Sequence, residues 1–321
     1  MRSLRFNFPV VSSPTEINLS RYLSAAGWKK TRLLQRAHFG AENLEFNTAI
    51  AQTLEYKHRL ADLVNKYCPE VMPLTYPIHD GNWREVLQGL PSAIKTWILK
   101  PALLNNGQYI KIFDQINDLE AHFKSSSRLG GEHVLQQYIT FPHLLRDNRK
   151  YSLRQFVVLT HYSGVFLFHR GYFNIALHPY KFDDFSDLSI HLTNEHLFEH
   201  TKNTLQIPSH LFEFYDRIFE QIKNLLTAVF RGLFTEYSTI LNIKKPQIAL
   251  LGFDFMLDNS ERVWLLEANH GPCFPINLEH PLQEAVYDDF WKKLISHFVE
   301  PLAQNEYHIK QSESFIPLNL R

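Results

Sequence analysis

Three oxygen-bearing side chains in two neighbouring apolar segments could together bind a cation. Asp254 lies inside the run GFDFMLD, and Glu267 and Asn269 end the run VWLLEANHGP. Side chains two positions apart on a strand point to the same face, so Glu267 and Asn269 are expected to project together. Buried carboxylates without a partner are costly, so this group needs a positive charge beside it. Either Mg²⁺, a hard ion that prefers oxygen ligands, or a neighbouring Lys or Arg could supply that charge.

Basic side chains at two other places could meet an anion. Lys100 closes the apolar run WILKP, and a polar loop containing Gly107 follows it. Such a loop can cover phosphate groups with its backbone N–H groups and the lysine, although a solvated lysine at a strand end is the alternative. In RKYSLRQFVV, the side chains of Lys150, Ser152 and Arg154 share one face of a strand. This row favours an anion site over ordinary surface.

Other polar residues carry weaker signals. Thr193 and Asn194 end the stretch DLSIHLTNEH, where they could also cap a helix. The 17 histidines are scattered and form no HExxH pair, so most of them are expected on the surface or in loops. Cys68 and Cys273 are too few for a disulfide framework or a zinc site, and they fit a reducing compartment.

Apolar periodicity predicts the elements that must position these side chains. Strands are expected at TWILKP, QYIKIF, HVLQQYI, YSLRQFVVLT, GVFLFHRGYFNIAL, ALLGFDFMLD and RVWLLEANH. Helices are expected over SPTEINLSRYLSAAG, residues 46–67, DQINDLEAHFK, residues 211–233 and residues 282–298. TWILKP and QYIKIF flank a polar loop and are expected to form a hairpin, and the turn HYSG is expected to join YSLRQFVVLT to GVFLFHRGYFNIAL. The last two strands form a further hairpin that should set Asp254 within about one residue of the level of Glu267. Because strands and helices come in blocks, the expected fold class is α+β.

Bulk composition describes an ordinary globular protein. The chain has 321 residues with 33 Lys+Arg and 33 Asp+Glu, so its formal net charge gives no overall attraction to nucleic acid or to a membrane. No apolar run reaches the roughly 18 to 20 residues of a membrane span. The N-terminal MRSLRFNFPVVSS has only a short, proline-broken apolar run, so a signal peptide is not expected. A cytoplasmic, monomeric protein is the default expectation.

Several of these segments, taken in order, resemble the tubulin–tyrosine ligase-like family of the ATP-grasp superfamily. They are WILKP…NGQYI, VLQQYI, RKYSLRQFVV, HRGYFNIA, HLTN and GFDFMLD…VWLLEANHGP, and they cover roughly residues 95–275. The resemblance implies an ATP-grasp fold that holds ATP and Mg²⁺ between two mixed α/β domains, with a small N-terminal domain. On this chain the N-terminal domain would be residues 1–68, the central domain 69–140 and the C-terminal domain 141–321. The implied reaction makes an acyl-phosphate from a carboxylate, which an amine then attacks.

The resemblance also implies roles for individual residues. The implied nucleotide contacts are Lys57, Lys100, Gly107, Gln136, Gln137, Tyr138, Ile139, Lys150, Thr193 and Asn194, with adenine lying against residues 136–139. Asp254, Glu267 and Asn269 would hold Mg²⁺. Arg154 would face phosphate or the acyl substrate, and the implied catalytic residues are Lys150, Arg154, Arg170 and Asn174.

Three positions depart from the family pattern. Tyr109 stands where the family loop G-x-G-I has its second glycine, and Ser152 stands where R-K-x-D-x-R has aspartate. Asn174 stands where G-x-x-R has an arginine that is expected to steady the acyl-phosphate. Arg170 could replace that arginine, because on a regular strand it shares the parity of Asn174. The nucleotide and metal residues are therefore kept, and the handling of the acceptor and the amino acid is expected to have diverged.

The sequence thus predicts an ATP- and Mg²⁺-dependent carboxylate–amine ligase that adds an amino acid to a protein or peptide. Tubulin is one candidate acceptor, and the sequence does not say which amino acid is added. Two alternatives stay open. One is a weakly active or inactive ATP-binding pseudo-ligase that binds a protein partner, and the other is an ATP-grasp ligase or kinase for a small molecule. No nucleic-acid or membrane partner is expected.

Overall fold

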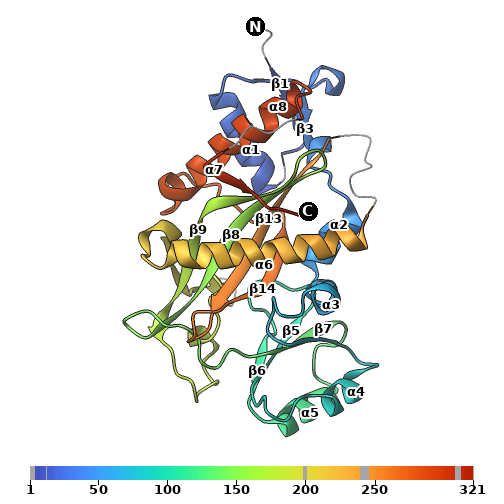
Figure 1. The fold of residues 1–321 in the computed structure, drawn as a ribbon, viewed down its shortest axis with the longest axis vertical. Helices are drawn as coiled ribbons and strands as arrows, with labels where there is room; N and C mark the ends of the chain where they lie inside the picture. Colours follow the sequence, from blue (N-terminus) through green and yellow to red (C-terminus); the bar gives the residue numbers. More distant parts are fainter. Residues whose placement is uncertain (1–3, 12, 198–200, 239–245, 308–311, 321) are drawn as a thin grey trace.

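The chain forms an elongated molecule in which two sheets lie at successive levels along the long axis (Figure 1). The computed structural model describes residues 4–11, 13–197, 201–238, 246–307 and 312–320. Strands and helices mix along the chain, as the predicted α+β class requires.

The larger sheet is antiparallel and has the strand order β12-β9-β8-β13-β14, with β15 also paired to β9. Its strands are β8 (Arg149–Thr160), β9 (Gly164–Pro179), β12 (Thr204–Pro208), β13 (Ile248–Leu257), β14 (Val263–His270) and β15 (Phe315–Pro317). The β13–β14 hairpin is confirmed, and Asp254 lies directly opposite Glu267. β13 also pairs with β8, which is distant in sequence, so the two predicted hairpins join into one sheet.

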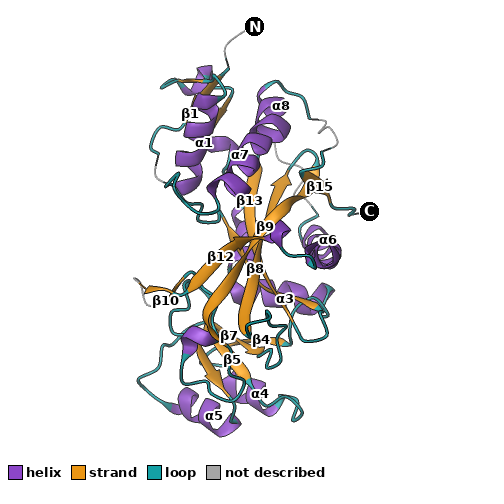
Figure 2. Cartoon of the chain, turned by 90° about the vertical axis from the view of Figure 1, so that its left-hand side faces the viewer, coloured by secondary structure: helices purple, strands orange, loops and turns teal. Residues whose placement is uncertain are grey.

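The two faces of the larger sheet are covered differently. One face packs against α6 (Tyr215–Glu236), α2 (Thr48–Glu55) and α3 (Lys57–Tyr67) through a core that includes Leu153, Phe173 and Phe253. On the other face, Phe156 and Phe168 pack against α1 (Pro14–Ala25) and the C-terminal helices. Those helices cover only one end of that face (Figure 2). The other end is turned toward the smaller sheet.

The smaller sheet has four strands in the order β4-β7-β5-β6. They are β4 (Thr75–Ile78), β5 (Trp97–Pro101), β6 (Lys111–Phe113) and β7 (His133–Gln137), and the predicted β5–β6 pairing is confirmed. Trp97 and Leu99 share a core with residues of α4 (Trp83–Gln88) and α5 (Ile116–Lys124). Since side chains alternate along a strand, Ile98 and Lys100 point to the opposite face, toward the larger sheet.

Short elements complete the chain. A parallel sheet has the order β2-β1-β3, from β1 (Arg5–Asn7), β2 (Lys29–Lys30) and β3 (Phe39–Gly40), and β10 (His196–Leu197) pairs with β11 (Thr201–Lys202). The 3₁₀ turns are η1 (Leu34–Arg36), η2 (Ala41–Asn43), η3 (Leu188–Ile190) and η4 (Ser209–Leu211). Residues before position 69 contribute to both faces of the larger sheet, and the predicted domain boundaries remain predictions.

Three predicted helices differ from the observed ones. The helix expected over residues 46–67 is broken at Tyr56, which is extended (φ −81°, ψ 115°), so α3 begins at Lys57. The periodicity hid this break because Ile50 of α2 and Leu60 of α3 face the same core. The helix expected from 211 begins at Tyr215. The last one continues to Ala303 as the π-turn η6 (Gln283–Tyr287), α7 (Asp288–Leu294), the π-turn η7 (Ile295–Val299) and α8 (Glu300–Ala303).

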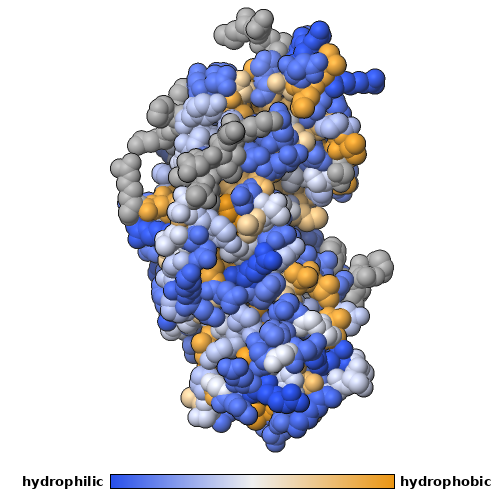
Figure 3. Space-filling model, turned by 90° about the vertical axis from the view of Figure 1, so that its right-hand side faces the viewer, coloured by the Kyte–Doolittle hydropathy of each residue, from blue (hydrophilic) through white to orange (hydrophobic). Residues whose placement is uncertain are grey.

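The surface is mostly hydrophilic on the face shown in Figure 3, where apolar residues form separate patches. Within the described ranges, no helix combines the length and apolarity needed to cross a bilayer.

Candidate active site

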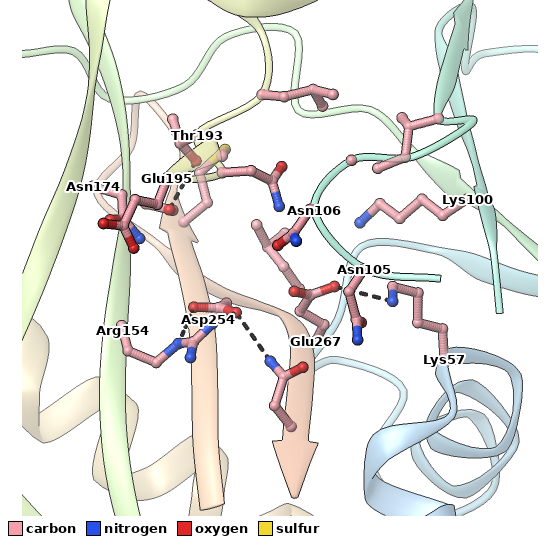
Figure 4. A pocket seen from close by; sticks show the side chains of 18 of the residues that line it. Lys57, Lys100, Asn105, Asn106, Arg154, Asn174, Thr193, Glu195, Asp254 and Glu267 are labelled. Atoms are coloured by element: carbon pink, nitrogen blue, oxygen red, sulfur yellow. Dashed lines mark hydrogen bonds and ion pairs between the residues drawn. The ribbon is translucent and has the colours of Figure 1, made fainter. Parts of the chain in front are cut away.

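A cavity of about 330 Å³ lies between the open end of the larger sheet and the smaller sheet. Figure 4 shows lysines from one side facing the strands of the other. The predicted site residues that line it are Lys57, Lys100, Gly107, Gln136, Gln137, Tyr138, Ile139, Lys150, Arg154, Asn174, Thr193, Asn194, Asp254, Glu267 and Asn269. The structure therefore gathers these residues, which come from separate segments of the chain, around one space.

Three charged residues stand side by side across the floor of the cavity; we call Arg154, Asp254 and Glu267 the charged row. β8 pairs Arg154 with Asp254, and β14 pairs Glu267 with Asp254 from the other side. Arg154 donates from Nε to Oδ1 (2.6 Å) and from Nη2 to Oδ2 (2.7 Å) of Asp254. Lys57 Nζ lies 3.5 Å from Glu267 Oε2. Both carboxylates thus have cationic neighbours. This is the alternative that the sequence left open, in which Lys or Arg rather than Mg²⁺ supplies the positive charge.

The charged row nevertheless fits a hard cation. Burial raises the pKa of Asp254 to about 6; Arg154 opposes this shift and the negative charge of Glu267 adds to it. Burial alone would also raise the pKa of Glu267, but the charges of Lys57, Lys100 and Arg154 outweigh it and lower the pKa. One more positive charge would offset the repulsion between the two carboxylates. A carboxylate oxygen that accepts one hydrogen bond also keeps a second lone pair for a metal.

Asn269 extends this donor set. Its Nδ2 donates to Oδ2 of Asp254 (3.4 Å), and a rotation of the amide by 180° would bring its oxygen to the carboxylates instead. Asp254, Glu267 and Asn269 therefore have the donor chemistry of a Mg²⁺ site.

A β-bulge in β14 decides where Glu267 points. Val263 and Leu265 are buried in the core under α6, and regular alternation would send Glu267 there too. The pairing register with β13 shifts between Asp254 and Phe255, so that Leu266 is an extra residue. The bulge reverses the alternation, and Glu267 and Asn269 face the cavity. The sequence contained an indication of this bulge, because Glu267 is an even number of residues from Val263 and Leu265 and would otherwise be expected in the core with them.

Two lysines approach from the smaller sheet and from α3. Lys100 Nζ donates to Oε1 of Gln136 (2.7 Å), whose Nε2 in turn donates to Thr75 Oγ1 (2.8 Å). Burial lowers the pKa of Lys100 to about 8, although Glu267 partly opposes this. Lys57 Nζ donates to the carbonyl of Leu104 (2.9 Å), which ties α3 to the loop after β5.

Lys150 is almost fully buried on β8. Its Nζ donates to the Tyr138 hydroxyl (2.8 Å) and to the His191 carbonyl (2.9 Å). Burial, and then the charge of Lys100, lowers the pKa of Lys150 to about 7. An anion between the two lysines would raise both pKa values again, so the cavity suits phosphate.

The loop after β5 lines the cavity, but the side chain of Tyr109 in this loop does not. Asn106, Gly107 and Tyr109 all have positive φ values (55°, 71° and 56°). A Cβ at Gly107 would lie 2.7 Å from Cδ2 of Leu197, which would have to move, and the positive φ itself favours glycine there. The Tyr109 side chain is 66% exposed and is not part of the lining. The substitution of the second glycine by Tyr109 therefore leaves the loop surface toward the cavity open.

Two residues further along β8 from Arg154, on the same face of the sheet, lies a set of uncharged side chains. We call Ser152, Asn174 and Gln206 the neutral row, since they stand opposite one another on β8, β9 and β12. Gln206 Nε2 donates to Asn174 Oδ1 (3.0 Å), and Thr193 Oγ1 donates to Ser152 Oγ (2.8 Å). The sequence missed Gln206 because β12 was not predicted as a strand. It also missed Asn105, Asn106 and Glu195 of the loops that line the cavity.

Arg170 is the one predicted site residue that does not line the cavity. Its Nη1 donates to the carbonyl of Ala285 (3.1 Å) and lies 4.0 Å from Asp289 Oδ2. β9 carries Arg170 beyond the open end of the sheet, to where η6 and α7 cover it. Arg170 and Asn174 are an even number of residues apart on one strand, but this is not sufficient to place Arg170 where the family arginine would lie.

A cavity between two sheets, with buried lysines facing a pair of carboxylates in register, is consistent with a nucleotide-binding fold of the ATP-grasp type. Comparison with known proteins gives the family. A model of the tubulin-tyrosine ligase family matches residues 68–307, and the chain belongs to that family.

Among curated relatives, the chain is similar to tubulin glycylase 3B of Tetrahymena thermophila, with 23% identity over 222 residues, 63% of this chain and 18% of that protein. It is 27% identical over 243 residues to the inactive polyglycylase TTLL10 of Homo sapiens, which covers 65% of this chain and 36% of the relative. It is 24% identical over 277 residues to the probable tubulin polyglutamylase TTLL2 of Mus musculus, at 80% and 49% coverage. The chain thus spans less than half the length of these relatives, which are named as a glycylase, an inactive polyglycylase and a probable polyglutamylase.

Proposed function

We propose that this protein is an ATP- and Mg²⁺-dependent carboxylate–amine ligase that modifies a protein or peptide by way of an acyl-phosphate. The observation that carries the proposal is the charged row, held in register on the larger sheet and facing Lys100, with Lys150 on the same side of β8 as Arg154. Family membership and relatives named as glycylases and a polyglutamylase support a ligase that joins an amino-acid unit to a protein.

In this proposal each part of the cavity has its own task. Asp254, Glu267 and Asn269 hold Mg²⁺, which offsets the negative charge that builds up where a carboxylate meets phosphate. Lys100 and Lys150 gain charge-assisted contacts with the phosphates, because their low pKa values recover beside an anion.

The remaining nucleotide contacts come from the chain segments around the lysines. Residues 136–139 receive adenine, and the loop at Gly107 together with Thr193 and Asn194 closes over the nucleotide. Lys57 positions Glu267 through their contact. Arg154 orients Asp254 and adds positive charge near the acyl group.

The neutral row supports a second candidate, an ATP-binding pseudo-ligase that acts by binding a protein partner. Ser152 and Asn174 are uncharged at the positions where the family motifs have aspartate and arginine. In addition, one relative is named inactive. Turnover separates the two candidates.

The test has two stages. Calorimetry first measures Mg-nucleotide binding to the wild-type protein and to Glu267→Gln, and we expect the variant to bind at least about tenfold more weakly, since a charged ligand is lost. An equal affinity would contradict the metal assignment. Intact-mass analysis then follows lysate proteins incubated with this protein, MgATP and isotopically labelled amino acids and amino-acid amides. A labelled mass increase that needs ATP supports the ligase, and nucleotide binding without any such increase or ADP release supports the pseudo-ligase.

A further inference from the structure

A concentration of positive charge lies in the N-terminal part of the chain, outside the cavity. Residues 29–36, KKTRLLQR, contain four basic side chains and no acidic one, and we call them the basic loop. The loop lies outside residues 68–307, which match the family model. The expectation that the protein has no membrane partner rested on the neutral charge of the whole chain, which conceals this local excess.

The cations of the basic loop are available to a partner. The four basic residues are all exposed; they are Lys29, Lys30, Arg32 and Arg36. Within the described part of the chain, none of their side chains forms a salt bridge or a hydrogen bond. Four unpaired cations on one short segment produce a positive potential that attracts a negatively charged surface.

Two leucines lie exposed between these cations. Leu33 is 43% and Leu34 is 52% exposed, and neither contributes to a hydrophobic core of the described residues. In the sequence they stand directly between Arg32 and the pair Gln35-Arg36. At the end of the molecule that carries the N-terminal segment, Figure 3 shows apolar residues beside strongly hydrophilic ones. The basic loop therefore displays apolar surface and positive charge together.

Hydrogen bonds hold the basic loop in this exposed form. Thr31 N donates to the Phe6 carbonyl (2.9 Å), and Asn7 Nδ2 donates to the Thr31 carbonyl (2.8 Å). In η1, Arg36 N donates to the Leu33 carbonyl (3.0 Å). The two leucines are thus displayed by an ordered backbone, and a partner meets them without first having to order the loop.

We propose that the basic loop docks this protein on an anionic phospholipid bilayer. The four cations contact the headgroups, and Leu33 and Leu34 enter the boundary between headgroups and acyl chains. This surface role goes beyond the proposed ligase function and does not depend on it.

An anionic bilayer accounts for both kinds of side chain in the loop. Its headgroup charge lies just outside an apolar layer, so lysine and arginine can stay at the headgroups while the leucines leave water. A nucleic acid or a glutamate-rich peptide would neutralise the cations but would offer the leucines no apolar layer. The pairing of cations with exposed leucines therefore favours the bilayer.

Docking through the basic loop leaves the smaller sheet uncovered. The loop begins with β2, which pairs with β1. β1 and β3 lie at one end of the long axis, and the smaller sheet lies at the other end (Figure 1). The cavity lies between the two large layers, so a docked molecule keeps its smaller sheet away from the bilayer.

The test is flotation of the whole protein with vesicles. Vesicles of phosphatidylcholine alone are compared with mixed vesicles that carry about 30% phosphatidylserine, which gives a negative surface potential. We expect binding to the mixed vesicles, at least about tenfold weaker binding to the neutral ones, and a progressive loss as salt screens the charges. Equal binding to both kinds of vesicle, or binding to neither, would overturn the proposal.

Removing cations from the basic loop should weaken docking strongly. Lys29→Gln combined with Lys30→Gln is expected to weaken binding to the mixed vesicles about 25-fold, at roughly fivefold for each charge. Arg32→Gln combined with Arg36→Gln takes its place if β2 does not tolerate the change.

A matched pair removes the same charge from the other end of the molecule. Lys95, just before β5, and Lys124, in α5, are both exposed. Lys95→Gln combined with Lys124→Gln changes the net charge by the same amount, and we expect vesicle binding to be kept. Equal losses in the two pairs would show that only net charge matters and would overturn the assignment to the basic loop.

The leucines separate a bilayer from other polyanions. Leu33→Ser combined with Leu34→Ser keeps every charge and should weaken binding to the mixed vesicles at least about tenfold, because the apolar contact is lost. The control is Leu129→Ser combined with Leu211→Ser, at positions 39% and 65% exposed elsewhere on the surface, and it should bind like the wild type. Unchanged binding of the Leu33/Leu34 variant overturns the proposal. Tighter binding of the wild type to polyglutamate or to a DNA oligonucleotide than to the mixed vesicles overturns it as well.

Discussion

The charged row and the neutral row lie next to each other on the same face of one sheet, yet they are stabilised in different ways. β8 supplies Arg154 to the first and Ser152 to the second. In the charged row, opposite charges are in register, and removing one partner leaves the other buried and unpaired. In the neutral row, amides and hydroxyls share hydrogen bonds and leave some capacity for a ligand. The same backbone can thus keep one half of a site while the chemistry of the other half changes.

Breaking the charged row should have the largest effect on stability. Arg154→Met leaves Asp254 without its counter-charge, and we expect the free energy of unfolding to fall by about 3–5 kcal/mol. Urea unfolding measures this. Arg149→Met on the same strand is the control, since Arg149 pairs with the exposed Asp147 and should cost no more than about 1 kcal/mol. Equal losses in the two variants would show that the pairing in the charged row adds no stability.

Converting the neutral row into a charged one tests the contrast directly. Ser152→Asp and Asn174→Arg each place an unpaired charge beside a buried partner, so each alone should destabilise the fold by about 2–3 kcal/mol. Combined, the two charges face each other, and a coupling energy of about 1–3 kcal/mol should be recovered. A double-mutant cycle in urea gives this number. Simple additivity would mean that the backbone does not bring these two positions into contact.

The dependence of nucleotide affinity on pH should separate the rows further. The free protein holds Lys100 with a pKa of about 8 and Lys150 with a pKa of about 7. Phosphate favours the ammonium forms, so binding is strongest below these values and weakens as pH rises through them. The slope should reach up to about tenfold per pH unit for each deprotonated lysine.

Calorimetric titration of the Mg²⁺-loaded ATP analogue across neutral and alkaline pH checks this. The slope should be reduced in Lys100→Gln and kept in Asn174→Ala. The same slope in Lys100→Gln as in the wild type would exclude Lys100 as a source of the pH dependence.

The smallest effect is expected from a single hydrogen bond of the neutral row. Thr193→Val removes the donor to Ser152 Oγ and should lower the free energy of unfolding by about 1 kcal/mol. Thr235→Val, which loses an exposed hydrogen bond to the Arg231 carbonyl on α6, should change it by less than about 0.5 kcal/mol. Thermal or urea unfolding compares them. A loss at Thr193 as large as that of Arg154→Met would erase the distinction between the rows.

Much of the candidate site followed from local sequence patterns. The β13–β14 hairpin could be predicted because a short polar turn joins two apolar runs, and the level of Asp254 with Glu267 is confirmed. Lys100 and the face shared by Lys150, Ser152 and Arg154 followed from strand alternation. The break at Tyr56 did not follow, because α2 and α3 present one continuous apolar face to the same core.

The sequence by itself determined that Lys150, Ser152 and Arg154 share one face of β8, because alternation along a regular strand is a property of neighbouring residues. It also carried the family motifs. Only the tertiary structure decided the partners: β8 pairs with β13 and so joins Arg154 to Asp254, and β12 adds Gln206 to Asn174. It likewise inserted the bulge that turns Glu267 out of the core and carried Arg170 past the cavity. Such pairings join residues far apart in the chain, and their register depends on how whole layers pack, so no local pattern specifies them.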